Sequence, residues 1–299
     1  MRIVVTGRNG QIARSLSERA ESANAVVTTI ARPEFDLQCP DRIFSAIKNA
    51  GADLVVAAAA YTAVDLAESE SDIARATNVV GSKAIGEATR ALSMPVIYLS
   101  TDYVFDGSLD RAYREDDAPR PINVYGETKH KGEQALAAAN PDHAIVRTAW
   151  VHSPFSKNFV RTMLTIAANK PEISVVGDQV GTPTSALEIA DGLLKMSRNI
   201  LTHPDNREMR GIFHMAATGV ASWAKFAEAI FETSAERGGA FARVHSIPSS
   251  AYPTLARRPA NSRLDVEKIA CVHGVVLPDW RGSVGATVAR LIDEQRSAR

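Results

Sequence analysis

Residues 2–13, RIVVTGRNGQIA, form the stretch that predicts the fold. The run from 2 to 6 is short and β-branched and ends at Gly7, a pattern typical of a buried parallel strand. Gly7 permits a tight turn, Gly10 lets a phosphate approach the backbone, and the small Ala13 lets the next helix pack on the strand. A helix over 11–19 then points its N-terminus at a pyrophosphate. This context favours a dinucleotide-binding turn over the alternative, a plain structural turn.

Strands and helices continue to alternate through the first half of the chain. Further strands are expected over 25–30, 53–60, 95–99 and 144–151, and helices over 41–50, 76–92 and 125–139. This order predicts an α/β protein with a doubly wound parallel sheet of the Rossmann type. We assign 1–151 to the dinucleotide-binding domain, with 185–198 and 211–234 returning to it. The remainder of 152–299 is assigned mainly to a smaller C-terminal substrate-binding lobe.

Composition excludes several classes of function. The 299 residues carry a net charge of +0, and no basic block suggests a nucleic-acid surface. The longest uncharged apolar run, at 54–61, is too short to span a membrane. Cys39 and Cys271 lie far apart and in no metal-ligand pattern, which indicates a reducing compartment. We therefore expect a cytoplasmic protein without nucleic-acid or membrane partners.

A second stretch predicts the chemistry. The strand ending near Leu99 is followed by Ser100 and Thr101, and a polar excursion then leads to Tyr125 and Lys129. Residues four apart share a helix face, so the phenol and the ammonium should lie close together. A nearby positive charge lowers a tyrosine pKa and suits the phenol to general acid catalysis, while Thr101 donates to the same acceptor oxygen. An ordinary exposed helix pair is the alternative for Tyr125 and Lys129.

The segment after the second expected strand bears on cofactor choice. An acidic residue there takes the ribose 2′-hydroxyl of NAD, whereas an arginine suits the 2′-phosphate of NADP. Arg32 occupies this place, so NADPH is favoured, with NADH as the alternative. Asp36 and Leu37, just beyond, are assigned to the adenine side of the cofactor site. A solvated loop arginine is the competing interpretation of Arg32.

Together these residues resemble the extended short-chain dehydrogenase/reductase superfamily and, within it, the dTDP-4-dehydrorhamnose reductase family. The resemblance covers nearly the whole chain. It rests on the segments GRNGQIA, AAAAYTAVDLAE, ATNVVG, STDYVFDG, NVYGETKHKGE, RTAWV, KNFVRTML, QVGTPT and RRPANSRLD. It implies NADPH-dependent reduction of the 4-keto group of a nucleotide-linked 6-deoxy sugar, most directly dTDP-4-dehydro-L-rhamnose.

The resemblance also implies roles for single residues. Tyr125 is the proton donor to the substrate carbonyl, Thr101 binds the same oxygen, and Lys129 lowers the Tyr125 pKa and holds the nicotinamide ribose. The residues implied along the cofactor are Gly7, Asn9, Gly10, Gln11, Ile12, Ala57, Ala58, Ala59 and Tyr61. Those implied for the nucleotide sugar are Tyr103, Trp150, Asn158, Arg258 and Asn261. Tyr103 and Trp150 as core aromatics, and Arg257 with Arg258 as a solvated pair, are the alternatives.

The chain departs from its relatives at two positions. Some relatives use glutamates to build a metal-linked dimer, and the matching positions here are Ser15 and Leu187. A hard divalent cation needs oxygen ligands that these residues lack. We therefore expect no metal, and a monomer or a weak homodimer.

Two other functions remain open from the sequence. One is another nucleotide-sugar reductase or an epimerase of the same superfamily. The other is a non-catalytic regulatory homologue that keeps NADP as a structural ligand. The complete Thr101, Tyr125 and Lys129 set favours an enzyme over the second.

Overall fold

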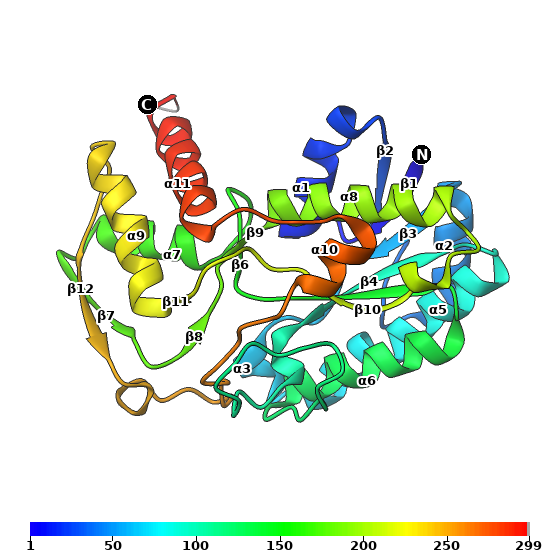
Figure 1. Cartoon of the computed structure of the whole chain (residues 1–299), viewed down its shortest axis with the longest axis horizontal. Coiled ribbons are helices and arrows are strands. Elements are labelled where there is room, and N and C mark those ends of the chain that lie inside the picture. Colours follow the sequence, from blue (N-terminus) through cyan, green and yellow to red (C-terminus); the bar gives the residue numbers. More distant parts are fainter. Residues whose placement is uncertain (298–299) are drawn as a thin grey trace.

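The computed structural model describes residues 1–297 and is built around one six-stranded parallel sheet (Figure 1). Its strands stand in the order β10-β5-β4-β3-β1-β2. Their bounds are β1 Arg2–Thr6, β2 Val26–Ile30, β3 Leu54–Ala57, β4 Val96–Thr101, β5 His143–Thr148 and β10 Gly211–His214. The chain runs outward from β1 to β2 and returns to the other side of β1 with β3. A ligand-binding crevice is expected where the order reverses, at the carboxyl ends of these strands.

Helices cover both faces of this sheet, which confirms the doubly wound prediction. One face carries α1 (Gln11–Arg19), α8 (Ala186–Thr202) and α10 (Glu267–His273). The other carries α2 (Pro40–Ala50), α5 (Gly81–Ala91) and α6 (Val124–Ala139). Because both faces are covered, the inner strands β1, β3, β4 and β5 bury almost every side chain, as the β-branched run in β1 predicts, whereas the edge strand β2 stays partly exposed.

A second apolar core lies beside the sheet domain, on the left in Figure 1. It contains α7 (Phe159–Ala167), α9 (Trp223–Glu236) and α11 (Trp280–Ser297), packed with β7 (Glu172–Val176) and β12 (Arg243–Ile247). β7 and β12 pair in parallel. Two short two-stranded sheets, β6 (Val151–His152) with β9 (Thr184–Ser185) and β8 (Val180–Gly181) with β11 (Ala221–Ser222), complete this part.

The segment 211–234 does not return to the sheet as a whole. β10 pairs with β5, as expected. Helix α9, however, buries Phe226 and Ile230 against α7 and α11 in the second core. The prediction is therefore wrong for residues 223–234, because the apolar face of this helix matches the neighbouring helices rather than the sheet.

The expected helix over 76–92 begins as a π-helical turn at Ala76–Val80 and becomes α5 at Gly81. Two short helices, α3 (Val64–Ala67) and α4 (Ser71–Arg75), precede it. A Cβ on Gly81 would lie 2.7 Å from the Leu37 carbonyl oxygen, and one on Gly86 would lie 2.8 Å from the Ala139 Cβ. These glycines thus allow close packing on a loop and on α6.

Within the described residues, no helix combines the length and apolar character that crossing a membrane requires.

Candidate active site

A cleft of about 800 Å³ lies at the carboxyl ends of β1, β3, β4 and β5, between the sheet domain and the second core. Residues from the glycine turn, from the end of β3, from the end of β4 and from α6 line it. Trp150 and Trp223 line its other side. The cleft therefore occupies the crevice that the strand order predicts.

The turn after β1 is shaped to receive a nucleotide phosphate. Gly7 has φ +91°, and a Cβ there would lie 3.7 Å from the Ala59 Cβ. Gly10 is the N-cap of α1, and it has no side chain to occupy the first N–H groups of the helix. The space where a Cβ would stand is open. Backbone N–H groups at such a helix start attract phosphate oxygens. The residues of this turn that were assigned to the cofactor and that line the cleft are Gly7, Asn9, Gly10, Gln11 and Ile12.

The end of β3 forms the neighbouring wall. Thr6 Oγ1 accepts hydrogen bonds from the Ala58 and Ala59 backbone nitrogens, at 3.0 and 2.9 Å. Ala58 and Ala59, both assigned to the cofactor, line the cleft together with Ala60 and Thr62. The methyl groups leave the wall flat enough for a cofactor to lie along it.

Two residues predicted for this wall lie elsewhere. Ala57 is buried inside β3. The Tyr61 hydroxyl donates to Glu70, at 2.7 Å, and its backbone N–H donates to Asn78. Neither side chain lines the cleft. The run of small residues at 57–60 predicted this wall of the cleft. The residue at which β3 ends decides which of them face the cleft.

Arg32, Asp36 and Leu37 lie outside the cleft lining. Arg32 is 75% exposed and its Nε lies 3.8 Å from Asp36 Oδ2. Leu37 is buried against Gly81, so its side chain supports α5. Arg32 follows the carboxyl end of β2 in a loop, where the guanidinium is accessible to a phosphate.

Helix α6 brings the predicted catalytic residues to the cleft. Asn123 caps its N-terminus by accepting from the Gly126 N–H, at 2.7 Å. A Cβ on Gly126 would lie 2.1 Å from the Tyr103 carbonyl oxygen, so this glycine lets α6 touch the segment after β4. Thr101, Tyr125 and Lys129 consequently line one cleft.

Burial shifts the pKa of the Tyr125 phenol. Burial raises the pKa of Tyr125 above its ordinary value, the Thr101 hydroxyl in hydrogen-bonding range opposes this, and Asp102 adds to it. The phenol is therefore protonated at neutral pH and available as a proton donor. Thr101 in turn donates to Asp102 Oδ1, at 3.0 Å. Burial raises the pKa of Asp102 to about 6.

The hydrogen bonds of Lys129 go to β4 rather than to Tyr125. Lys129 Nζ donates to the Tyr98 hydroxyl and to the Leu99 carbonyl oxygen, at 2.8 and 2.7 Å. Burial lowers the pKa of Lys129 to about 7, against an opposing effect of Glu133. The sequence spacing placed Lys129 and Tyr125 on one helix face, but β4 supplies the partners of the ammonium.

The predicted aromatic contacts of the sugar lie in the cleft. The rings of Tyr103 and Tyr125 meet edge to face, with centroids 5.7 Å apart. Trp150 has φ +47° and stacks on Trp223, with centroids 3.6 Å apart. The sequence interpretation missed Trp223, because α9 was assigned to the sheet domain. It also assigned no role in the cleft to Ser100, Thr148, Ser156, Lys157 and Phe159, which line it, although four of them lie inside segments that carried the resemblance and Ser156 adjoins one.

The three polar residues predicted for the nucleotide diphosphate have other partners. Asn158 caps α7 and donates to the Ser153 carbonyl oxygen, at 2.8 Å. Asn261 donates to the Leu109 and Arg111 carbonyl oxygens, at 2.8 and 2.7 Å. Neither lines the cleft.

Arg258 is paired as well, but it adjoins the cleft. Its guanidinium donates to both oxygens of Asp65, at 3.1 and 2.7 Å, and also contacts Tyr103. The ion pair is partly exposed. Arg258 thus lies next to Tyr103, which lines the cleft. Unlike Asn158 and Asn261, it carries a positive charge that suits a phosphate group.

The polar loop 106–123 packs against the later chain rather than on the cleft. Tyr113 forms a parallel bridge with Leu264 and stacks on Phe105, with ring centroids 4.2 Å apart. No residue of this loop lines the cleft. The contacts of Asn261 hold the loop against the later chain instead.

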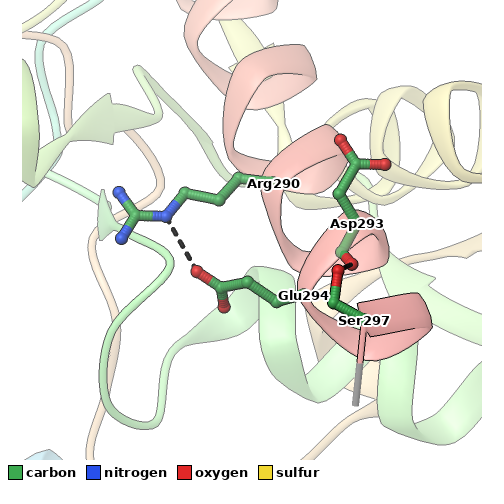
Figure 2. Close-up of a pocket in the computed structure, with 4 residues that line it drawn as sticks. All are labelled: Arg290, Asp293, Glu294 and Ser297. Atoms are coloured by element: carbon green, nitrogen blue, oxygen red, sulfur yellow. Dashed lines mark hydrogen bonds and ion pairs between the residues drawn. The ribbon is translucent and has the colours of Figure 1, made fainter. Parts of the chain in front are cut away.

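A separate hollow on the last turns of α11 carries no comparable chemistry. Figure 2 shows its four lining residues, Arg290, Asp293, Glu294 and Ser297. Arg290 Nε pairs with Glu294 at 2.9 Å, and the Ser297 hydroxyl donates to the Asp293 carbonyl oxygen at 3.0 Å. Among residues 1–297, no group of three or more histidine, cysteine, aspartate or glutamate side chains is placed to hold a metal.

A doubly wound sheet with a threonine, a tyrosine and a lysine at the carboxyl ends of its strands defines a class: the short-chain dehydrogenase/reductases, which are NAD(P)-dependent oxidoreductases. Within that class, the model of the family described as RmlD substrate binding domain matches residues 1–292, and the chain belongs to this family.

Known proteins agree with this assignment. A dTDP-4-dehydrorhamnose reductase of Sinorhizobium fredii is 46% identical over 298 residues, covering 100% of both chains. The crystal structure of a dTDP-4-dehydrorhamnose reductase from Clostridium acetobutylicum has a TM-score of 0.88 at 32% identity, covering 98% of this chain and 100% of that one. A Bacillus anthracis dTDP-4-dehydrorhamnose reductase in complex with NADP has a TM-score of 0.88 at 28% identity, covering 97% and 99%.

Proposed function

We propose that this protein reduces the 4-keto group of dTDP-4-dehydro-L-rhamnose with NADPH, giving dTDP-L-rhamnose. The observation that carries the proposal is the meeting of Thr101 and Tyr125 in a cleft whose other wall is a phosphate-binding turn. Reduction of a ketone places negative charge on its oxygen, and a hydrogen-bond donor beside an acid can neutralise it.

The residues of the cleft fit the nicotinamide cofactor. Its phosphates match the turn at Gly7 and Gly10, where the backbone is open, and its length matches the wall at Ala58 and Ala59. When bound, NADPH supplies the hydride. We assign the ribose contact to Lys129 and the adenosine 2′-phosphate contact to Arg32, whose guanidinium is exposed.

Tyr125 gives its proton to the carbonyl oxygen, and Thr101 orients that oxygen. The raised pKa of Tyr125 keeps the proton on the phenol until charge develops on the substrate. Trp150 and Trp223 offer a stacked apolar surface for the sugar, and Tyr103 offers a hydroxyl beside it. Arg258 would contact the diphosphate by exchanging part of its bonding to Asp65.

The test is NADPH oxidation by the purified protein with a panel of nucleotide-linked 4-keto sugars. We expect turnover with dTDP-4-dehydro-L-rhamnose above the others. Preference for another sugar would replace the substrate but keep the reaction. Tightly retained NAD with interconversion of sugar epimers would indicate an epimerase. Cofactor binding without turnover would indicate the regulatory homologue.

Three further points belong to this proposal. The sheet domain would bind the cofactor and the second core would carry most of the sugar site. The protein would act as a monomer or weak homodimer, since Ser15 and Leu187 replace metal-binding glutamates. It would work in the cytoplasm, where its two exposed free cysteines stay reduced. Sedimentation with and without EDTA tests the second point, because a metal-linked dimer would dissociate.

A further inference from the structure

The ammonium of Lys129 is held by the strand opposite its own helix. Lys129 is 2% exposed, and both of its hydrogen-bond acceptors, the Tyr98 hydroxyl and the Leu99 carbonyl oxygen, lie on β4. Nζ also lies 4.1 Å from the centroid of the Tyr98 ring. An ammonium has three N–H donors. Two are fixed by β4, which leaves one for the cleft that Lys129 lines.

The Tyr98 hydroxyl belongs to a chain of hydrogen bonds in which each group donates to the next, from Lys129 through Tyr98 and Ser82 to the Asn78 carbonyl oxygen. Ser82 Oγ lies 2.7 Å from the Asn78 carbonyl oxygen and 3.2 Å from the Tyr98 hydroxyl. A carbonyl only accepts, so Ser82 donates to Asn78 and its oxygen accepts from Tyr98. The Tyr98 oxygen then accepts from Lys129. Each hydroxyl donates once and accepts once.

This chain ends at a fixed group that carries no exchangeable proton of its own. The Asn78 carbonyl belongs to the π-helical turn, and the Asn78 side chain donates to Thr128 Oγ1 and to the Tyr61 carbonyl oxygen, both at 3.1 Å. A path of this kind cannot deliver protons to solvent. It can fix the position of the tyrosine oxygen and, through it, the ammonium.

Gly132 makes this approach possible. A Cβ at position 132 would lie 2.1 Å from the Asn78 carbonyl oxygen and 2.7 Å from the Tyr98 hydroxyl oxygen. Gly132 lies less than one turn after Lys129 on α6. Helix α6 therefore carries both the Lys129 ammonium and the glycine whose missing side chain lets the Tyr98 hydroxyl lie close to the helix.

Glu133 acts on the charge of Lys129 and Tyr98 accepts from it, and other charged or titratable groups lie on the elements around them. Glu133 and Tyr125 lie on α6, Tyr98 lies on β4, and Arg147 lies on β5 with its guanidinium paired to Glu133. Asp102 follows β4. The Tyr98 oxygen stabilises the charged form of Lys129 by accepting a hydrogen bond from it, whereas burial disfavours that form.

We infer that Tyr98 is a positioning residue for the reductase reaction: its hydroxyl holds the Lys129 ammonium charged and aimed at the cleft. The inference rests on the proposed function in so far as Lys129 serves that reaction. Tyr98 itself does not line the cleft and touches no reacting group.

The test compares Tyr98→Phe with a matched control, Tyr113→Phe. Tyr113 is also buried and also uses its hydroxyl, which donates to Asp106 at 2.7 Å, but it lies outside the cleft. For Y98F we expect kcat/KM to fall about tenfold and the alkaline limb of its pH profile to move to lower pH, because the ammonium loses an acceptor. Y113F should keep the wild-type rate and profile. A wild-type pH profile in Y98F would overturn the inference.

A second measurement separates this inference from the proposed function. In protein labelled with ¹⁵N-lysine and bound to NADP⁺, the Lys129 signal is identified by its loss in Lys129→Met. We expect it to titrate at lower pH in Y98F than in the wild type, and an unchanged titration would overturn the inference even if the enzyme is active. Failure of the wild type to reduce any 4-keto sugar would instead overturn the proposed function. Ser82→Ala, which leaves the Tyr98 oxygen in place, should shift the titration in the same direction but less, and serves if Y98F does not fold.

Discussion

The Arg147 guanidinium contacts the Glu133 carboxylate through two hydrogen bonds, of 2.9 and 2.8 Å, and both side chains are almost fully buried. They join β5 to α6. Hydrogen bonds to Arg147 and His130 hold the pKa of Glu133 at about 2, although burial alone would raise it. The pair therefore fixes the helix that carries Tyr125 and Lys129.

Removing one member of this pair should destabilise the protein strongly. We expect Glu133→Gln to lower the free energy of unfolding by about 3–5 kcal/mol, because Arg147 would remain charged and buried without a counter-charge. Urea denaturation at pH 7 measures this. Glu87→Gln, which breaks the exposed Lys83–Glu87 pair on α5, is the control and should cost less than about 1 kcal/mol. Equal losses in the two variants would contradict the structural role of Arg147.

The proton donor can be tested without disturbing the cofactor site. We expect Tyr125→Phe to lower kcat about 10²–10⁴-fold, because the phenol proton is lost while the ring stays in place. Fluorescence titration with NADPH should give nearly the wild-type Kd. Full turnover in this variant would remove Tyr125 from the mechanism.

The cofactor preference should depend on Arg32. We expect Arg32→Asp to raise the KM for NADPH about tenfold or more relative to NADH, because a carboxylate repels the 2′-phosphate and accepts from a 2′-hydroxyl. Arg90→Asp makes the same charge change at an exposed position outside the cleft and should leave the ratio unaltered. An unchanged ratio in both variants would assign the phosphate to another residue.

Two helical glycines should respond oppositely to alanine. Gly132→Ala should destabilise the protein and reduce kcat, since its Cβ would collide with the Asn78 carbonyl and the Tyr98 hydroxyl. In Gly282→Ala, on α11, the Cβ meets nothing within 4 Å, so the better helix propensity should stabilise the protein by roughly 0.5–1 kcal/mol. Thermal unfolding compares the two. Tolerance of G132A would show that α6 can shift without loss of function.

Acid should destabilise the protein through its buried histidines. Burial lowers the pKa of His152 and of His214 to about 3 and that of His273 to about 4. Between these values and about 6.5 the unfolded chain binds protons that the folded chain excludes, so stability rises with pH across this window and is lost as pH falls. Each histidine should contribute about 1 kcal/mol per pH unit.

Unfolding measured from pH 7 to pH 4 tests this dependence. His152→Gln should flatten the slope, because a neutral side chain replaces one that titrates only after unfolding. His203→Gln, at an exposed position on the C-cap of α8, should leave the slope unchanged. If His152→Gln has the same pH dependence of stability as the wild type, His152 takes up its proton in the folded state, and the prediction is wrong.

Local sequence patterns predicted most of the framework. The β-branched run before Gly7 predicted β1, and its spacing predicted both the turn and α1 over residues 11–19. The four-residue spacing of Tyr125 and Lys129 predicted their common helix. These features depend on residues that are close together in the sequence, so local patterns are enough to predict them.

Contacts between distant segments could not be predicted in the same way. The partners of Lys129 come from β4, thirty residues earlier, and Trp223 reaches Trp150 because α9 packs in the second core. Asn158 and Asn261 lie in segments that resemble substrate-binding ones, yet backbone carbonyl groups occupy their side chains. Where a polar side chain finds its partner depends on which loops the fold brings beside it.

The sequence by itself determined the α/β framework, the glycine turn after β1 and the chemical identity of the Thr101, Tyr125 and Lys129 set. The tertiary structure decided the pKa values and the hydrogen-bond partners of these three residues. Burial raises the pKa of the Tyr125 phenol, and β4 rather than Tyr125 receives the Lys129 ammonium. Residue spacing fixes which groups share a helix face, but solvent exclusion and long-range partners fix their charge and direction.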